Sequence, residues 1–455
     1  GLILACYSFA QLTLQMHQLI LFSLDHFGHG DAGPFSHNLS NIFAFHFLFQ
    51  AVLQDTQLNQ YVDQVGRKMG QQSHRSQMPY SFRVVNANYI NAYAFPGGSI
   101  AATRGILLKL DNEAQLAALL GHELGHVNAR HTAQQMSKAM LTQALVGGVA
   151  AIAGSQAASQ DASLRYSRQN EQEADRIGMQ NLVAAGWDPK GSAGMFEVMQ
   201  AQSRNYGSRP PEFLMTHPLT ESRIADARNR AAQYPPKMYQ DNPEFHLMRA
   251  RVELSFIEDP AEAVAHFRKK RKESRGADAV AAQYGLILAL SGNGEYAEAR
   301  ELLAPMREFK PDNMTYALAE TDIDLAQEKF DLAIDNLERG VKLVPGNHPI
   351  TIQLGKAYFK AGRYTDADKL LTAHAKLKPT NVTLWYWLAE VQGLAGNRFG
   401  LHQSRAEYFF LNGAMKQALE QLNLALKLAP DDVAVERINR RMGFFHQVGK
   451  ALGQF

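Results

Sequence analysis

Cysteine is nearly absent from this chain of 455 residues, which contains Cys6 and no other. A single thiol cannot form a disulfide within the chain, and it excludes a metal site built on several thiolates. Because the sequence contains 16 histidines, any metal chemistry must use imidazole and carboxylate ligands. One cysteine does not decide the compartment, since a secreted protein can also lack disulfides.

An excess of charge of one sign is also missing. The 46 lysine and arginine residues nearly balance the 44 aspartate and glutamate residues, which gives a formal net charge of +2. Nucleic-acid-binding domains are typically basic, so we expect no nucleic-acid partner. Hydrophobic residues make up 46% of the chain and charged residues 20%, which excludes wholesale disorder, a collagen-like chain and a polytopic membrane protein.

Long apolar runs are absent as well. A membrane-spanning helix needs about 20 mostly apolar residues, and glutamine and histidine interrupt the apolar residues of segment 1–22. The apolar, glycine-rich run at 141–154 is too short to span a bilayer, and we interpret it as a buried or gating segment. We therefore predict no transmembrane span.

The first 52 residues form an atypical N-terminal segment. We interpret this segment as a possible remnant of a signal peptide, although it has no basic region at its start. Ile3-Leu4-Ala5-Cys6 weakly matches a lipoprotein cleavage site, which leaves lipidation of Cys6 an open question. The irregular spacing of the histidines in this segment argues against a metal site built from His26, His29, His37 and His46.

The pattern becomes regular in residues 53–235, where it predicts a domain of helices and short strands. We expect, in chain order, a helix over 58–66 stopped by Gly66, strands at 82–85 and 99–102, a helix over 112–140 with Asp111 as its N-cap, and a helix over 167–185. The strand near 99–103 is our candidate for a sheet edge that binds substrate. Two consecutive prolines at 235 and 236 mark the predicted end of the domain.

Residues 236–450 repeat with a period of 34 residues. Small residues, large apolar residues and prolines each recur at this spacing, and the last of each set is shifted by a further half period. This is the tetratricopeptide signature, in which helix pairs stack into an all-α solenoid. The half-period shift predicts an irregular connection or an extra helix near 393–405. The recurring positions are Tyr296, Phe330, Tyr364 and Met415, then Ala299, Ala333, Ala367 and Ala418, then Pro311, Pro345, Pro379 and Pro430.

The segment His122-Glu123-Leu124-Gly125-His126 is a HExxH motif within a predicted helix. Residues four apart lie about 40° from each other around a helix, so both imidazoles can bind one metal ion. Glu123 projects about 100° from His122, where its carboxylate can take a proton from a metal-bound water. Zinc is the expected ion, one per chain, and a position left to water makes the site catalytic. The motif alone is weak, because it also arises by accident.

A third ligand decides whether the motif binds metal. His131 follows His126 by five residues, which places it about 140° around a continuous helix and directs it elsewhere. We therefore interpret His131 as a surface or packing histidine. The metzincin pattern needs glycine and histidine where this sequence has Ala129 and Thr132, which excludes that class.

The second predicted helix supplies better candidates. Glu171 and Asp175 lie four residues apart, so one carboxylate can bind the ion while the other accepts an N–H from a ligating histidine. Glu173 lies about 200° from Glu171 and should face away. Taken without the HExxH motif, these acidic residues fit an ordinary solvated helix face.

Three segments resemble the M48 family of zinc metallopeptidases: residues 91–98 (NAYAFPGG), 121–127 (GHELGHV) and 166–178, which ends in EQEADRIG. The resemblance implies His122, His126 and Glu171 as zinc ligands and Glu123 as the catalytic base. With the repeats it implies an α+β, mainly α, fold: a zincin-like metallopeptidase domain followed by a tetratricopeptide solenoid.

The resemblance also suggests roles for two further residues. Asp175 matches an acidic residue of the catalytic machinery that is often assigned as a proton donor, and we favour an orienting role. His217, in Thr216-His217-Pro218-Leu219, matches a loop histidine that takes the water's position on the metal and keeps the protease silent.

The expected substrates are polypeptides, bound as an extra strand at a sheet edge, which selects extended and unfolded chains. The family resemblance implies a periplasmic endopeptidase with chaperone-like activity, in contact through its repeats with outer-membrane β-barrel proteins and their assembly machinery. One alternative is a repeat-based chaperone or scaffold with a self-inhibited peptidase site. Another is a helical repeat adaptor with an accidental HExxH motif, which predicts no stoichiometric zinc.

Overall fold

The computed structural model describes residues 52–135, 166–205 and 210–451. The predictions for residues 1–51, among them the fate of Cys6 and the histidines of that segment, lie outside the described residues, as does the apolar run at 141–154. The described chain separates between Val252 and Glu253 into two compact units. The predicted domain boundary at 235 and 236 stays a prediction.

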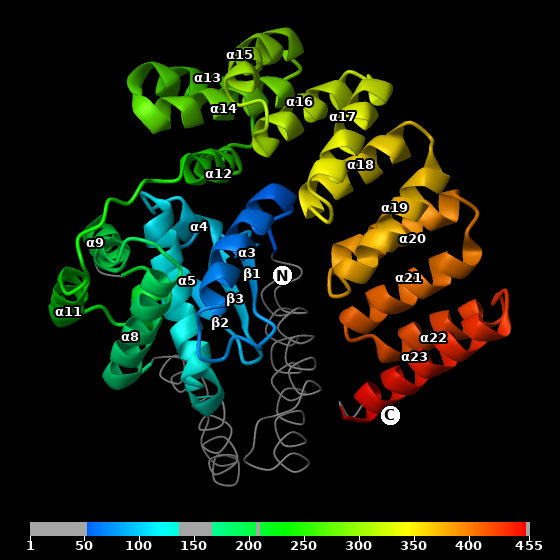
Figure 1. Cartoon of the computed structure of the whole chain (residues 1–455), viewed down its shortest axis with the longest axis horizontal. Coiled ribbons are helices and arrows are strands. Elements are labelled where there is room, and N and C mark those ends of the chain that lie inside the picture. The colour runs from blue at the N-terminus through cyan, green and yellow to red at the C-terminus, as the bar shows by residue number, and fades with distance from the viewer. Residues whose placement is uncertain (1–51, 136–165, 206–209, 452–455) are drawn as a thin grey trace, which may run out of the picture. The chain divides into compact units, whose positions relative to one another are not determined.

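The first described helix of the first unit is α3 (Thr56–Gly70; Figure 1). Its N-cap is Asp55. The prediction that Gly66 stops this helix is wrong, because α3 continues past it to Gly70. A Cβ at Gly66 would lie 2.3 Å from the ring of Phe82, so the glycine serves close packing of α3 on the sheet.

The sheet has three strands, β1 (Ser81–Val85), β2 (Ala92–Ala94) and β3 (Ser99–Thr103), in the order β1-β3-β2. β3 pairs with β1 in parallel and with β2 in antiparallel register. The two predicted strands are therefore confirmed, but the prediction that 99–103 forms an edge is wrong. Short β2 came without a sequence signal, and its pairing makes β3 the central strand, with all five residues buried.

After the short helix α4 (Arg104–Leu107), helix α5 (Glu113–Asn128) carries the HExxH motif. Its N-cap is Asn112, whose side chain accepts a hydrogen bond from the Gln115 N–H, and the prediction of Asp111 is wrong. The helix also ends much earlier than predicted. Arg130 has a φ of 60°, a left-handed conformation that ends a helix, and a new helical segment begins at residue 131.

Helix α8 (Arg168–Ala184) starts at the predicted position with Ser167 as its N-cap, and it packs closely against α5. The chain continues through α9 (Lys190–Asn205), α10 (Glu212–Thr216), α11 (Glu221–Ala232) and α12 (Pro243–Leu254). The side chain of Arg251, on α12, donates to Asp55 at 2.7 Å, so α12 is tied to the start of the first unit.

The second unit consists of consecutive antiparallel helices, and the predicted register positions recur in them. The alanines of the 34-residue pattern are fully buried where neighbouring helices meet, and its large apolar residues are the first residues of α15, α17, α19 and α22. The helices are α13 (Pro260–Glu273), α14 (Gly276–Gly292), α15 (Tyr296–Phe309), α16 (Met314–Ala326), α17 (Phe330–Leu343), α18 (His348–Lys360), α19 (Tyr364–Leu377), α20 (Val382–Leu394), α21 (Arg398–Leu411), α22 (Met415–Leu426) and α23 (Asp432–Ala451).

One detail of the repeat prediction is wrong. Helix α21 occupies the region of the predicted extra helix, but it begins 34 residues after α19 and so belongs to the regular series. Helix α22 is the first helix of the next pair, but it carries the residues that the earlier pairs have in their second helix. The signature positions are therefore shifted by half a period. Within the described ranges, no helix combines the length and the apolar character that a membrane span requires.

Candidate metal centre

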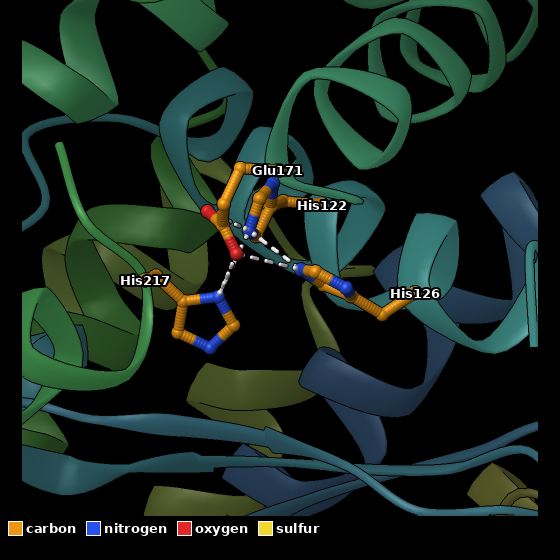
Figure 2. A group of neighbouring side chains, drawn as sticks. All are labelled: His122, His126, Glu171 and His217. Carbon is orange, nitrogen blue, oxygen red and sulfur yellow. Dashed lines mark hydrogen bonds and ion pairs between the residues drawn. The ribbon is translucent and has the colours of Figure 1, made fainter. Parts of the chain in front are cut away.

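Four buried side chains converge between α5, α8 and the loop after α10. His122 and His126 come from α5, Glu171 from the first turn of α8, and His217 from the residue that follows α10 (Figure 2). Each offers one ligand atom, and these four atoms all lie within 4.8 Å of one another. The structure thus brings together the three predicted ligands and the predicted loop histidine.

Most of the distances among these atoms match the edges of a tetrahedron around one small cation. The Nε2 atoms of His122 and His126 are 3.1 Å apart, and Glu171 oxygens lie 3.4 and 3.5 Å from them. His217 Nδ1 lies 3.2 Å from His122 Nε2 and 3.1 Å from Glu171 Oε1. A regular tetrahedron with metal–ligand bonds of about 2.0–2.1 Å has edges of roughly 3.3–3.4 Å.

The charges of the site also call for a cation. Glu123 and Glu171 are fully buried and Asp175 nearly so, while Arg223 is the buried guanidinium that contacts Glu171 and Asp175. With neutral histidines, three carboxylates against one guanidinium leave two negative charges uncompensated. Buried charge is costly unless it is paired, so the residues present fit a bound metal ion.

Glycines allow the two ligand-bearing helices to approach closely. A Cβ at Gly125 would lie 2.6 Å from the backbone oxygen of Ala174, and one at Gly178 would lie 2.9 Å from the backbone of Gly121. Flexible side chains cannot relieve these contacts, because the neighbouring atoms belong to backbone. The spacing between the histidines on α5 and Glu171 on α8 therefore depends on these glycines.

Asp175 holds the first histidine. Its Oδ1 lies 2.9 Å from His122 Nδ1, which directs His122 Nε2 toward the other ligands. Arg223 donates to both oxygens of Asp175, at 2.7 and 2.8 Å. The pKa of Asp175 is lowered, because these Arg223 hydrogen bonds outweigh the burial that would raise it. The carboxylate is thus ionised and fully engaged.

Arg223 is the functional residue that sequence reasoning missed. Its Nη1 lies 2.6 Å from Glu171 Oε2 and donates to the backbone oxygen of Pro218 at 2.7 Å. One guanidinium therefore links both carboxylates of α8 to the loop that carries His217. Arg223 lies on α11, far along the chain from either motif, so no local pattern pointed to it.

Glu123 lies beside the cluster with both carboxylate oxygens buried and without a hydrogen-bond partner among the described residues. The Nε2 atom of His217 lies 3.6 Å from Glu123 Oε1. Burial raises the pKa of Glu123. The Glu123 carboxylate thus has a raised pKa, lies beside the ligand cluster and has no hydrogen-bond partner of its own among the described residues. Such a carboxylate is suited to accept a proton.

The pKa values of the ligands reflect their mutual attraction. Burial opposes ionisation of Glu171, but the positive charges of His217 and His122 lower its pKa well below the usual range. Burial also lowers the pKa of His122, but Glu171 and Asp175 outweigh it and raise the value to about 10. In the metal-free protein the cluster therefore holds a proton on His122. The positive charge of this proton lies where the geometry fits a metal cation.

His131 is not among the four clustered ligand atoms, but it is buried and contacts one of them, so the prediction that it is directed elsewhere is wrong. Its Nδ1 lies 3.1 Å from His126 Nδ1. The helical angle failed because α5 ends at Asn128, and the chain reverses at Arg130 before residue 131. Glu173 points away from the ligands as predicted, and its Oε2 lies 3.1 Å from His131 Nε2. The ring of Tyr166 stacks on His126 with 3.9 Å between centroids.

Comparisons with known proteins agree with this site and fold. Residues 56–231 match peptidase family M48, and residues 324–391 match a tetratricopeptide repeat. The beta-barrel assembly-enhancing protease of Escherichia coli (strain K12) is 33% identical over 390 residues, covering 82% of this chain and 80% of that protein. Its counterpart in Yersinia pestis is 31% identical over 424 residues, covering 88% and 87%. The mitochondrial metalloendopeptidase OMA1 of Arabidopsis thaliana is 32% identical over 155 residues, covering 33% and 31%.

The fold and the site define a metal-dependent endopeptidase with a repeat domain for protein–protein contacts. The chain belongs to peptidase family M48, and over most of its length it is similar to the beta-barrel assembly-enhancing proteases. The predicted family resemblance, fold class and enzyme class are thereby confirmed. The alternative of a repeat adaptor with an accidental HExxH motif is wrong.

Proposed function

We propose that this protein is a zinc endopeptidase that acts on outer-membrane β-barrel proteins in the periplasm and is silenced by its own His217. The observation that carries the proposal is the near-tetrahedral set of His122, His126, Glu171 and His217, with the carboxylate of Glu123 beside it. Three of these side chains, His122, His126 and Glu171, would hold the ion during catalysis, and displacement of His217 would leave room for the attacking water.

Zinc is the ion that two neutral imidazoles and a carboxylate suit best, and when bound it polarises a water and the scissile carbonyl. Glu123 is the base that takes the proton of the attacking water and passes it to the leaving amine. Asp175 keeps the proton of His122 on Nδ1 and so orients this ligand. We assign Asp175 no proton transfer, because Arg223 occupies both of its oxygens.

The edge strand β2 is the proposed substrate platform in place of β3. Asn91 and Phe95 direct their backbone toward β3, since Asn91 O accepts from Thr103 N and Phe95 N donates to Ser99 O. By alternation, Ala92 and Ala94 face the opposite side, where an extended polypeptide can pair with Ala94 and with the Ala92 carbonyl, since the Ala92 N–H already donates to Asn91 Oδ1 at 2.9 Å. Binding through backbone hydrogen bonds makes little demand on substrate sequence and favours unfolded or stalled chains.

Silencing by His217 follows from its position at the fourth corner of the cluster. The ring stacks on Phe213, and the backbone N–H of Phe213 donates to Ile90 O, two residues before the start of β2. The loop with His217 therefore occupies both the water position and the approach to the substrate strand. Displacement of this loop would open the two together.

The substrate class and location come from the relatives. Proteins named beta-barrel assembly-enhancing protease match four fifths of this chain or more, which supports a role in the assembly of β-barrel proteins of the outer membrane. The repeat domain is the proposed contact surface for these substrates and their assembly machinery. When a stalled substrate binds to the repeat domain, the protein either assists its assembly, as a chaperone does, or degrades it.

Metal content of the purified full chain tests the ligand set. We expect one zinc per chain by mass spectrometry, and loss of zinc in His122→Ala and in Glu171→Ala. Glu123→Gln should keep its zinc but lose cleavage of an unfolded β-barrel protein. Zinc retained in both ligand variants would refute the assignment.

His217→Ala tests the silencing. This variant should keep zinc through the three remaining ligands and cleave the same substrate faster than the unaltered protein. A variant that binds zinc but gains no activity would contradict the inhibitory role of His217.

A second candidate function is a repeat-based chaperone or scaffold whose peptidase site stays inhibited. The observation that favours it is the presence of His217 within the cluster, where it would take the position of the attacking water. Complementation in cells separates the two functions. If Glu123→Gln restores outer-membrane assembly fully while disruption of the repeat surface abolishes it, the scaffold is the main function.

A further inference from the structure

The second histidine ligand has no carboxylate of its own. The Nδ1 atom of His122 lies 2.9 Å from an oxygen of Asp175, whereas the Nδ1 atom of His126 faces the Nδ1 atom of another histidine, His131, at 3.1 Å. His131 is brought there by the reversal of the chain at Arg130, and it is 3% exposed. Its far nitrogen, Nε2, lies 3.1 Å from Glu173 Oε2, and the Glu173 side chain is 59% exposed.

With Glu173 ionised and His131 neutral, these contacts determine which nitrogen carries the proton in both histidines. An ionised Glu173 can only accept, so His131 Nε2 must be the donor. A neutral His131 then carries a bare Nδ1, which accepts a hydrogen bond from His126 Nδ1–H. His126 Nε2 is left without a proton, and this is the atom that faces His122 and Glu171.

Without these contacts the opposite arrangement is available to His126. A proton on His126 Nε2 would donate to His122 Nε2, 3.1 Å away, and no lone pair of His126 would point into the cluster. A metal ion must then displace that proton to bind. Selection of the Nδ1–H form by a partner therefore increases metal affinity.

We propose that His131 and Glu173 are positioning residues that select the metal-binding tautomer of His126 from the surface of the protein. The inference rests on the proposed zinc site and adds to it a relay of Glu173, His131 and His126. Tyr166 complements the relay, because its ring stacks on His126 and holds the plane of the imidazole. The two histidines of the HExxH motif are thus oriented in different ways, one by a carboxylate and one through an intervening imidazole.

Zinc affinity of the full chain, measured by competition with a chelating dye, tests the relay. His131→Phe keeps a ring in the buried position but removes both nitrogens, and we expect zinc affinity to fall about 10–100-fold. His131→Gln supplies an acceptor and a donor, and it should restore affinity to within a few-fold of the parent. Glu173→Ala should show a smaller loss, of the same direction. His74→Phe and His74→Gln, at an exposed histidine of the same unit, are the matched controls and should change nothing.

The two replacements separate positioning from packing. If His131 only fills space, phenylalanine will bind zinc as well as the parent and glutamine will not, and the proposal is overturned. Failure of the zinc site itself is distinguishable, because then the unaltered protein and His126→Ala would bind zinc equally poorly.

Nuclear magnetic resonance of the unaltered zinc-loaded protein keeps the proposal testable if a variant does not fold. In protein labelled with ¹⁵N-histidine, we expect the His126 proton on Nδ1 and the His131 proton on Nε2. A His131 proton on Nδ1 would contradict the relay, whatever the variants do.

Discussion

Replacement of Arg223 by glutamine gives a quantitative test of how the metal site is held together. The guanidinium is 4% exposed and contacts two carboxylates at 2.6 to 2.8 Å. Removal of one partner from a buried ion pair typically costs about 3–5 kcal/mol, because the remaining charge stays buried without compensation. At the lower value, the folding equilibrium of the first unit shifts by roughly 100-fold or more.

The effect should depend on metal. Glu171 gains a second positive partner when an ion is bound, so the loss of stability from Arg223→Gln should be smaller in the zinc-loaded protein than in the metal-free one. Asp175 has no such replacement, and it loses the hydrogen bonds that keep it in place against His122. We therefore also expect weaker zinc binding.

The assay uses denaturant unfolding of the full chain, followed by tryptophan fluorescence. The chain has three tryptophans, and with Trp385 and Trp387 replaced by phenylalanine, Trp187 reports on the first unit alone. Arg228→Gln, on the same helix, is the matched control.

The control separates buried from exposed ion pairs. Arg228 pairs with Glu197 at 2.8 Å, but the two side chains are 63% and 45% exposed, so the expected cost is below about 1 kcal/mol. Equal, small effects of Arg223→Gln and Arg228→Gln in the metal-free protein would refute the reasoning.

Three further predictions concern helix packing and pH. Gly125→Ala should abolish tight zinc binding, because its Cβ would lie 2.6 Å from the α8 backbone. The control Gly292→Ala meets nothing within 4 Å and should stabilise the protein by about 0.4–1 kcal/mol. Zinc titration measures the first effect and unfolding the second, and normal zinc affinity in Gly125→Ala would contradict the packing argument. Ala367→Leu overfills a fully buried position of the repeats and should cost about 1–3 kcal/mol, while Ala297→Leu, at an exposed position, should cost little in the same unfolding assay. Burial lowers the pKa of His374 to about 4, so below the unfolded value of about 6.5 the unfolded chain takes up the proton first. The free energy of unfolding of the repeat unit should therefore fall by up to about 3 kcal/mol as the pH falls from 6.5 to 4. A His374→Gln variant with the same pH dependence of unfolding as the parent would show that His374 is not the cause.

The repeat unit shows how far local pattern can go. Each helix pair packs on its neighbours in sequence, so a 34-residue period in Ala299, Ala333 and Ala367 was enough to place the helices of three units. The half-period shift at Met415 was misinterpreted, because the residue pattern shows which helix faces are buried but does not show how many helices lie between two matching positions. Only the helix boundaries put α21 in the regular series.

The metal ligands were also within reach of sequence. Helical periodicity and chemical type brought out His122, His126, Glu171 and Asp175 as candidates, because each pair lies four residues apart on one helix, and the family resemblance then implied Glu171 as the third ligand. Prediction failed where the helix did not continue. The left-handed residue Arg130 carries no glycine signal, and it turned His131 from the far side of an assumed helix into a partner of His126.

The sequence by itself determined the period of the repeats, the chemistry of the HExxH motif and the paired carboxylates, because all of these depend on residues close together along the chain. Tertiary structure alone decided which strand lies at the sheet edge, and that Arg223 joins the two carboxylates to the loop of His217. Strand order and buried ion pairs depend on contacts between distant segments, and the free energy of such contacts comes from burial and pairing in three dimensions, which leave no period in the sequence.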